Sequence, residues 1–303
     1  MIHGKIPEWL KGADCKSAVY DFDGSNPSLP TNKGLQETAD PFVLLKYYVN
    51  LYTISNMSYF KYCSKDIYFE EHGKGTPLIL LHGNTSCGKM FDPIVPKLAD
   101  KYRVIVIDFM GGGRSERIEK WPADLWFDWA CQVKALCDHL GLQQVKIIGS
   151  SGGALAAVNV ALEYPELVES FVADSFEGLK ADPGITEQIH NGRAQAKSFG
   201  GFVEYLMTLH GDDWEQVFDA DTDAVLRHAE QIGDFFHKPI EELKVPMLLT
   251  GSLEDNMFPK GHCRVLFDEI CARTSLAKVH IFEHGGHPAM LSNMDDFVAL
   301  ILN

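Results

Sequence analysis

The sequence predicts an α/β protein: a mostly parallel, doubly wound sheet with a helical cap inserted after its sixth strand. Short apolar runs at 78–81 and 104–107 are typical of strands that are buried on both faces. Segments with helical periodicity alternate with such runs from residue 58 onward, which implies parallel strands covered by helices on both sides. At 175–244 this alternation stops, and the sequence there is largely helical.

The expected strands and helices are short and follow one another regularly. Strands are expected at 59–63, 66–70, 78–81, 104–107, 145–148, 168–173, 246–249 and 278–282. Helices are expected at 89–101, 124–140, 152–164, 260–272 and 288–302. In the helix at 124–140, the residues expected to face inward are Leu125, Phe127, Trp129, Val133 and Leu136.

These elements divide the chain into three parts. Residues 57–174 and 245–303 are expected to form the core, and 175–244 the helical cap. Residues 1–56 form an N-terminal extension without an assigned fold.

The composition of three further segments predicts whether each is a loop, a packed helix or a solvated helix face. Residues 21–33 are rich in turn-forming residues and are expected to be a loop, while the apolar segment 42–54 is expected to be a helix packed on the core. The cap contains a run of acids that is expected to form a solvated helix face. These acids are Asp212, Asp213, Glu215, Asp219, Asp221 and Asp223.

Net charge, cysteine content and hydropathy argue against several classes of partner and of structural site. The formal net charge of −15 would repel nucleic acid and anionic membrane surfaces. Seven scattered cysteines without a C-x-x-C pair support neither a zinc ribbon nor a disulfide framework, so we expect reduced thiols in a cytoplasmic protein. No apolar run has the length of a membrane helix or resembles a secretory signal. Neither a metal nor another cofactor is expected, although His280, His284 and His287 lie close together in the sequence.

A serine motif follows the expected strand at 145–148. The sequence Gly149-Ser150-Ser151-Gly152-Gly153 fits G-x-S-x-G only with Ser151 at the centre. Such a serine sits on a strained turn between a strand and a helix, where flanking side chains would clash and glycines are required. The N-terminus of the helix that follows favours negative charge near the serine. Ser151 is therefore the candidate nucleophile.

A serine nucleophile needs a base and an acid that orients the base. Two histidines, His284 and His287, follow the last expected strand, and we favour His287, which lies between that strand and the last helix. Two acids, Glu254 and Asp255, follow the strand at 246–249, and we favour Asp255. The oxyanion would be bound by two backbone N–H groups, those of Gly152 after the nucleophile and Asn84 after the strand at 78–81.

Taken together, these motifs resemble the α/β-hydrolase superfamily, and specifically its serine-nucleophile members with an inserted cap. The resemblance covers about four-fifths of the chain from residue 58 and includes the order serine, acid, histidine. It implies that 175–244 covers the pocket, and it does not extend to residues 1–56. The motifs that carry it are His82-Gly83-Asn84, Asp108 with Gly111-Gly112-Gly113-Arg114-Ser115, the serine turn, the acid loop and Gly286-His287.

Comparison with the reaction types known in this superfamily reduces the number of reactions that this chain is expected to catalyse. Haloalkane and epoxide hydrolases carry Asp where this chain has Ser151, and C–C hydrolases commonly have Trp soon after the catalytic histidine, where this chain has Pro288. The Trp typical of the serine turn in proline iminopeptidases is also missing. The resemblance therefore implies hydrolysis of a small-molecule ester, thioester or lactone through an acyl-enzyme. The alternatives are a ligand receptor with little turnover, and an acyltransferase.

Aromatic and methionine residues near the motifs predict an apolar pocket. Phe109 and Met110 follow the strand at 104–107, and Met257 and Phe258 follow the acid. Trp214 lies in the cap. These five residues are the candidates for binding an apolar acyl group.

Overall fold

The computed structural model describes residues 56–303. The loop at 21–33, the helix at 42–54 and all but the last residue of the extension expected at 1–56 lie outside the described residues. Within the described part, no helix is both long and apolar enough to cross a membrane.

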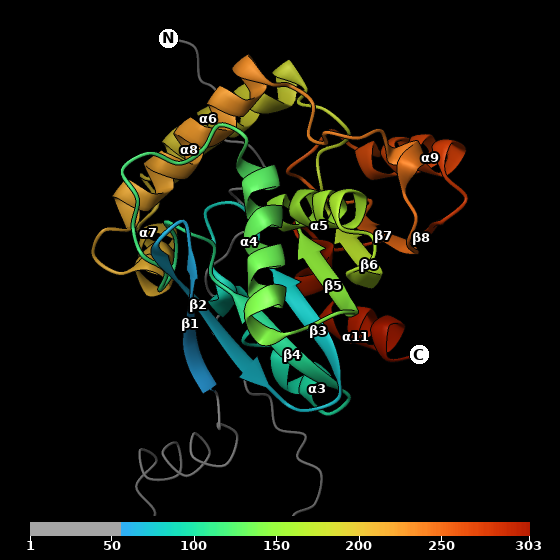
Figure 1. Cartoon of the computed structure of the whole chain (residues 1–303). Coiled ribbons are helices and arrows are strands. Elements are labelled where there is room, and N and C mark those ends of the chain that lie inside the picture. Colours follow the sequence, from blue (N-terminus) through green and yellow to red (C-terminus); the bar gives the residue numbers. More distant parts are fainter. Residues whose placement is uncertain (1–55) are drawn as a thin grey trace, which may run out of the picture.

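One eight-stranded sheet forms the centre of the molecule (Figure 1). Its spatial order is β1-β2-β4-β3-β5-β6-β7-β8. Only the pairs β1–β2 and β2–β4 are antiparallel, and the other strands run parallel, which confirms the predicted fold class. The strands are β1 (Asn56–Tyr62), β2 (Lys65–His72), β3 (Thr76–Leu81), β4 (Tyr102–Ile107), β5 (Val145–Ser150), β6 (Val168–Asp174), β7 (Met247–Ser252) and β8 (Ala277–Phe282).

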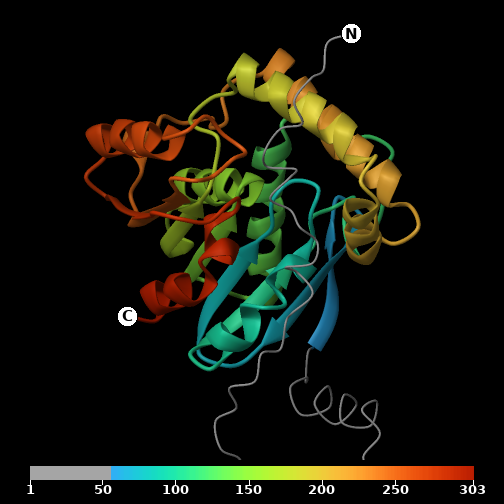
Figure 2. The same cartoon turned by 180° about the vertical axis from the view of Figure 1, so that it is seen from behind.

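Helices cover both faces of the sheet (Figures 1 and 2). Side chains of a strand alternate between the faces, so Ile79 and Leu81 pack into one core cluster while Leu78 and Leu80 pack into the other. The first cluster includes α4 (Leu125–Leu140), α5 (Gly152–Glu163) and α9 (His262–Arg273). The second includes η1 (Gly88–Phe91), α3 (Val95–Ala99), α10 (Ala289–Ser292) and α11 (Met294–Leu302).

Two expected helices are each divided into two. The segment 89–101 contains η1 and α3, because Pro96 lacks an N–H and so favours the start of a new helix. The segment 288–302 contains α10 and α11, which are separated at Asn293. In α4, Phe127 was expected to face the core, but it does not belong to it. Its ring stacks on that of His237, with the ring centroids 3.9 Å apart.

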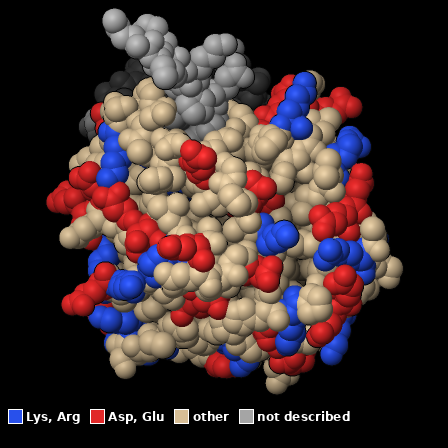
Figure 3. All heavy atoms as spheres, turned by 90° about the horizontal axis from the view of Figure 1, so that it is seen from above, with Lys and Arg blue, Asp and Glu red and all other residues tan. Residues whose placement is uncertain are grey.

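Three helices and a short 3₁₀ helix lie between β6 and β7 and replace the regular alternation there. They are α6 (Pro183–Ala196), α7 (Gly200–His210), α8 (Trp214–Gln231) and η2 (Ile240–Glu242). In Figures 1 and 2, α6 and α8 run side by side at one end of the molecule. On the face that they form, basic side chains are interspersed among the acidic ones (Figure 3).

One acid of the insertion departs from the expected solvated face. Asp219 and Asp223 are exposed, with 58% and 60% of their side-chain surface accessible, but Asp221 is fully buried. It forms an ion pair with Arg193 of α6 at 2.7 Å. The reason lies in the helical period, because Asp221 falls on the same face of α8 as the buried Val217 and Ala224.

Candidate active site

Ser151 occupies a strained turn between β5 and α5. Its backbone angles are φ 55° and ψ −121°, a conformation that is costly for a residue with a side chain. The turn is held by a 2.8 Å hydrogen bond from the Ser151 N–H to the carbonyl oxygen of Asp174. A Cβ at Gly149 would overlap the carbonyl of Gly153, and one at Gly153 would overlap the carbonyl of Leu81. Packing therefore explains both glycines of the motif.

The loop after β3 lies against this turn. A Cβ at Gly83 would come within 3.0 Å of the Ser151 Cβ, and a Cβ at Gly152 would overlap the Asn84 side-chain oxygen. Asn84 and Gly152 line the same cavity as Ser151. Within residues 56–303, neither the backbone N–H of Asn84 nor that of Gly152 donates a hydrogen bond to another described residue. The two N–H groups that were expected to bind an oxyanion are thus placed beside Ser151 without an acceptor of their own.

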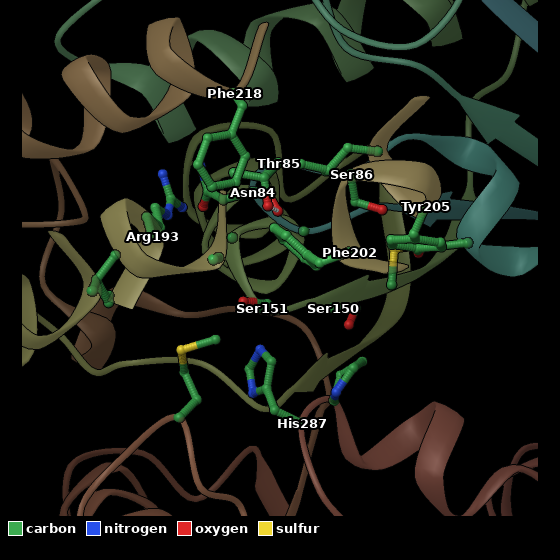
Figure 4. Close-up of a pocket in the computed structure, with 18 of the residues that line it drawn as sticks. Asn84, Thr85, Ser86, Ser150, Ser151, Arg193, Phe202, Tyr205, Phe218 and His287 are labelled. Carbon is green, nitrogen blue, oxygen red and sulfur yellow. Dashed lines mark hydrogen bonds between the residues drawn. The ribbon is translucent and has the colours of Figure 1, made fainter. Parts of the chain in front are cut away.

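His287 and Asp255 form a hydrogen-bonded pair, with 2.9 Å between Nδ1 and Oδ2. The second oxygen of Asp255 accepts the Met257 N–H at 2.9 Å, which fixes the carboxylate. Because the carboxylate accepts from Nδ1, the proton of the neutral imidazole lies on Nδ1 and Nε2 is free to accept another. Figure 4 shows the His287 ring pointing toward Ser151, with Asn84 and Thr85 on the opposite side.

The pKa of His287 is raised above its usual value. Burial alone would lower it, but the charge and hydrogen bond of Asp255, with a further contribution from Asp174, outweigh that effect. Asp174 lies at the end of β6, and burial raises the pKa of its carboxyl group to about 7. Its oxygens accept hydrogen bonds from Thr250 Oγ1 and the Met290 N–H, so they are already occupied.

The other acid and the other histidine pair with each other. His284 Nδ1 lies 3.2 Å from Glu254 Oε1, and both side chains are largely exposed. Neither residue lines the cavity that contains Ser151. His287 lines the cavity with Ser151, and Asp255 is linked to the site through its hydrogen bond to His287, whereas Glu254 bonds to His284 outside the site.

A cavity of about 1180 Å³ lies between the serine turn and the inserted helices. Met257 and Phe258 line it, as expected, together with Met90, Leu155, Phe202 and Phe218. Its charged lining residues are Glu177, Arg193 and Glu204. Burial raises the pKa of Glu177 to about 7, and the charge of Arg193 is matched by Asp221.

The structure corrects the expectation for three other pocket candidates. Phe109 stacks on Trp129 in the core, with the ring centroids 4.2 Å apart, and does not line the cavity. Met110 is buried in the same core, where its N–H bonds to the side chain of Gln132. Trp214 starts α8 at a position away from the cavity.

Two side chains that the sequence analysis missed contact the loop beside Ser151. Asp221 accepts hydrogen bonds from the Asn84 side chain and the Thr85 N–H, both at 3.0 Å. His210 Nε2 lies 3.1 Å from the Thr85 carbonyl. The helical period of α8 carries a signal for Asp221, whereas no sequence pattern pointed to His210.

Among the described residues, no group of three or more His, Cys, Asp or Glu side chains could hold a metal ion.

Comparison with known proteins identifies similar chains. A model of the alpha/beta hydrolase fold matches residues 76–218. The pimeloyl-[acyl-carrier protein] methyl ester esterase of Legionella pneumophila is 30% identical over 247 residues, which cover 78% of this chain and 98% of the relative. The 2-hydroxy-6-oxo-6-(2'-aminophenyl)hexa-2,4-dienoic acid hydrolase of Metapseudomonas resinovorans is 25% identical over 262 residues, or 77% of this chain and 85% of the relative.

Among solved structures, carboxylesterase CesB from Bacillus subtilis has a similar fold. The TM-score is 0.63, the sequence identity is 19%, and the match covers 86% of this chain and 95% of the esterase. At this identity the match shows the fold alone.

Proposed function

The chain belongs to the α/β-hydrolase family and is a hydrolase, and from this premise we propose that it cleaves carboxylic esters, thioesters or lactones with an apolar acyl group. The observation that carries the proposal is the hydrogen-bonded pair of Asp255 and His287, with 2.9 Å between Oδ2 and Nδ1, in which His287 lines the same cavity as Ser151 on its strained turn. This placement supports Ser151 as the nucleophile, His287 as the base and Asp255 as the orienting acid.

The proposed reaction proceeds through an acyl-enzyme. Ser151 Oγ attacks the substrate carbonyl while its proton passes to His287 Nε2, and Asp255 stabilises the imidazolium. The N–H groups of Asn84 and Gly152 donate hydrogen bonds to the oxyanion. His287 then gives the proton to the leaving alcohol or thiol. In deacylation, His287 takes a proton from a water molecule as that water attacks the acyl carbon. His287 then returns the proton to Ser151 Oγ as the bond between the acyl carbon and this oxygen breaks and the acid is released.

The charges of the cavity favour a neutral substrate over a carboxylate. Some relatives are named as hydrolases of dienoic acids, which are carboxylates at neutral pH. In this chain Arg193 is the one Lys or Arg among the described lining residues, and Asp221 already neutralises it. Glu177 and Glu204 also line the cavity, and each adds a negative charge when its carboxyl group is ionised. A buried substrate carboxylate would therefore lack a free cation to offset its desolvation.

A screen with p-nitrophenyl esters from acetyl to octanoyl, a thioester and a lactone tests this proposal, with the Ser151→Ala variant as the blank. We expect turnover that depends on Ser151 and is greatest for acyl chains of intermediate length. Turnover of a dienoate with none of any ester would instead indicate C–C hydrolysis. Ligand binding without turnover would indicate a receptor, and product formed only with an added alcohol or amine would indicate an acyltransferase.

The pH dependence of kcat/KM follows from the raised pKa of His287. The base must be the neutral imidazole, so activity should fall as the pH falls through this pKa. Since Asp255 raises the pKa above the usual value of about 6.5, we expect the midpoint of the rise above about pH 6.5. Initial rates between about pH 5 and 9 measure it. A flat profile, with chemistry as the limiting step, would contradict a histidine base.

The cavity wall predicts which aromatic residue of the insertion controls acyl-chain preference. Phe202 lines the cavity (Figure 4), whereas Trp214 does not. Phe202→Ala should shift the ratio of kcat/KM for octanoyl and butanoyl esters by about tenfold, because it removes apolar contacts and adds volume. Trp214→Ala is the matched control and should leave the ratio unchanged. Equal ratios in both variants and the wild type would place the acyl chain elsewhere.

The six described cysteines are all free thiols. Free thiols suit a reducing compartment, and we propose that the enzyme acts on small molecules in the cytoplasm.

A further inference from the structure

The loop beside Ser151 contains a second strained residue. Thr85 has φ 58°, a left-handed conformation that is unfavourable for a β-branched residue. Such a conformation persists only where the surrounding structure fixes it. Thr85 directly follows Asn84, whose N–H is the proposed oxyanion donor, so the contacts that fix Thr85 constrain the backbone directly beside that N–H.

Asp221 is the centre of the contacts that fix this loop. Its Oδ2 accepts hydrogen bonds from Asn84 Nδ2 and from the Thr85 N–H, each at 3.0 Å. Its Oδ1 accepts a 2.7 Å hydrogen bond from Arg193 on the neighbouring helix. The carboxylate is fully buried, so these bonds are charge-assisted and shielded from water.

Two further side chains hold the loop from other directions. His210 Nδ1 accepts the Gly113 N–H at 3.0 Å, so its proton lies on Nε2, which donates to the Thr85 carbonyl at 3.1 Å. Burial also lowers the pKa of His210, which favours this neutral form. Trp126 Nε1 donates to Asn84 Oδ1 at 3.1 Å. Both peptide groups of Thr85 and both ends of the Asn84 amide side chain are thus bonded.

We propose that Asp221 is a positioning residue for the reaction, which holds the Asn84 N–H in the direction that binds the oxyanion. This inference rests on the proposed function. It gives the inserted helices a second role besides forming the pocket, because α8 supplies Asp221, α6 supplies Arg193 and α7 supplies His210. Oxyanion donors contribute to the rate only when they are preorganised, so the loop and the inserted helices act as one unit.

The test compares Asp221→Asn with Asp223→Asn, which removes the same charge from the same helix at an exposed position. Asp221→Asn should lower kcat by about 10- to 100-fold, somewhat less than the loss of a whole oxyanion donor, and change KM by less than about threefold. Its affinity for a trifluoromethyl ketone, which forms a tetrahedral oxyanion adduct with the serine, should fall by a similar factor. Asp223→Asn should match the wild type in all three measurements.

A second variant, Asn84→Ala, keeps the backbone N–H but removes the side chain that Asp221 and Trp126 hold. It should also lose at least about tenfold in kcat and in affinity for the ketone, and it decides the matter if Asp221→Asn does not fold. Wild-type kcat and ketone affinity in a folded Asp221→Asn, or in Asn84→Ala where the first variant does not fold, would overturn the inference. If instead Ser151→Ala retains full activity, it is the proposed function that fails.

Discussion

Replacing Asp255 by asparagine is expected to lower kcat by about 10⁴, because the amide can hold His287 in the wrong tautomer and cannot stabilise its charged form. The carboxylate now accepts from His287 Nδ1 at 2.9 Å and is fixed by the Met257 N–H. An asparagine that presents its NH₂ group to the ring would require Nδ1 to be the acceptor, which places the proton on Nε2. That nitrogen could then no longer accept the proton of Ser151.

Glu254→Gln is the matched control for this substitution. Glu254 is the neighbouring acid, but it binds the exposed His284 and lies outside the cavity. The Glu254→Gln substitution should therefore lower kcat by less than about tenfold. The reversed order of effects would make Glu254 the orienting acid. Small losses in both variants would point to another carboxylate, of which Asp174 is the nearest candidate because it also contributes to the raised pKa of His287.

Replacing Ser151 by alanine is expected to lower kcat by about 10³ or more while the fold is retained. No other hydroxyl has the same place on the turn between β5 and α5. Ser150→Ala is the control, because the Ser150 hydroxyl is buried and has no hydrogen-bond partner among the described residues. Removing an unpartnered hydroxyl should cost little stability, and kcat should stay within about tenfold of the wild type. Circular dichroism and thermal unfolding of both variants verify that the fold is intact.

Most of the fold could be predicted from the sequence because its signals are local. Buried parallel strands appear as short apolar runs, and each expected strand from 59–63 to 278–282 corresponds to one of β1 to β8. The positions of Ser151, Asp255 and His287 could be inferred because each follows a strand, and the carboxyl ends of parallel strands meet at one edge of the sheet. Their catalytic roles stay predictions.

The cavity lining could not be predicted in the same way, because the position of an aromatic residue in the sequence does not determine which side of the sheet edge it faces. Phe109 follows β4 as expected, yet it stacks on Trp129 and belongs to the core. Phe202 gave no motif signal, and it lines the cavity only because the insertion folds back over the strand ends.

Asp221 shows the same limit for a charged residue. A run of acids is usually a solvated surface, and composition alone cannot reveal the one member that turns inward. The helical spacing of Asp221 from Val217 and Ala224 does indicate the buried face. Its partners Asn84, Thr85 and Arg193 come from two distant segments, so only the folded chain brings them together.

The most direct test of the central claim is to locate the adduct that a fluorophosphonate forms with the protein, by peptide mass spectrometry. The reagent reacts with a serine that an adjacent base activates. We expect one adduct, on Ser151, in the wild type and in Ser150→Ala, and none in Ser151→Ala. Fragment spectra that place the adduct on Ser150, or undiminished labelling of Ser151→Ala, would contradict Ser151 as the nucleophile and with it the proposed mechanism.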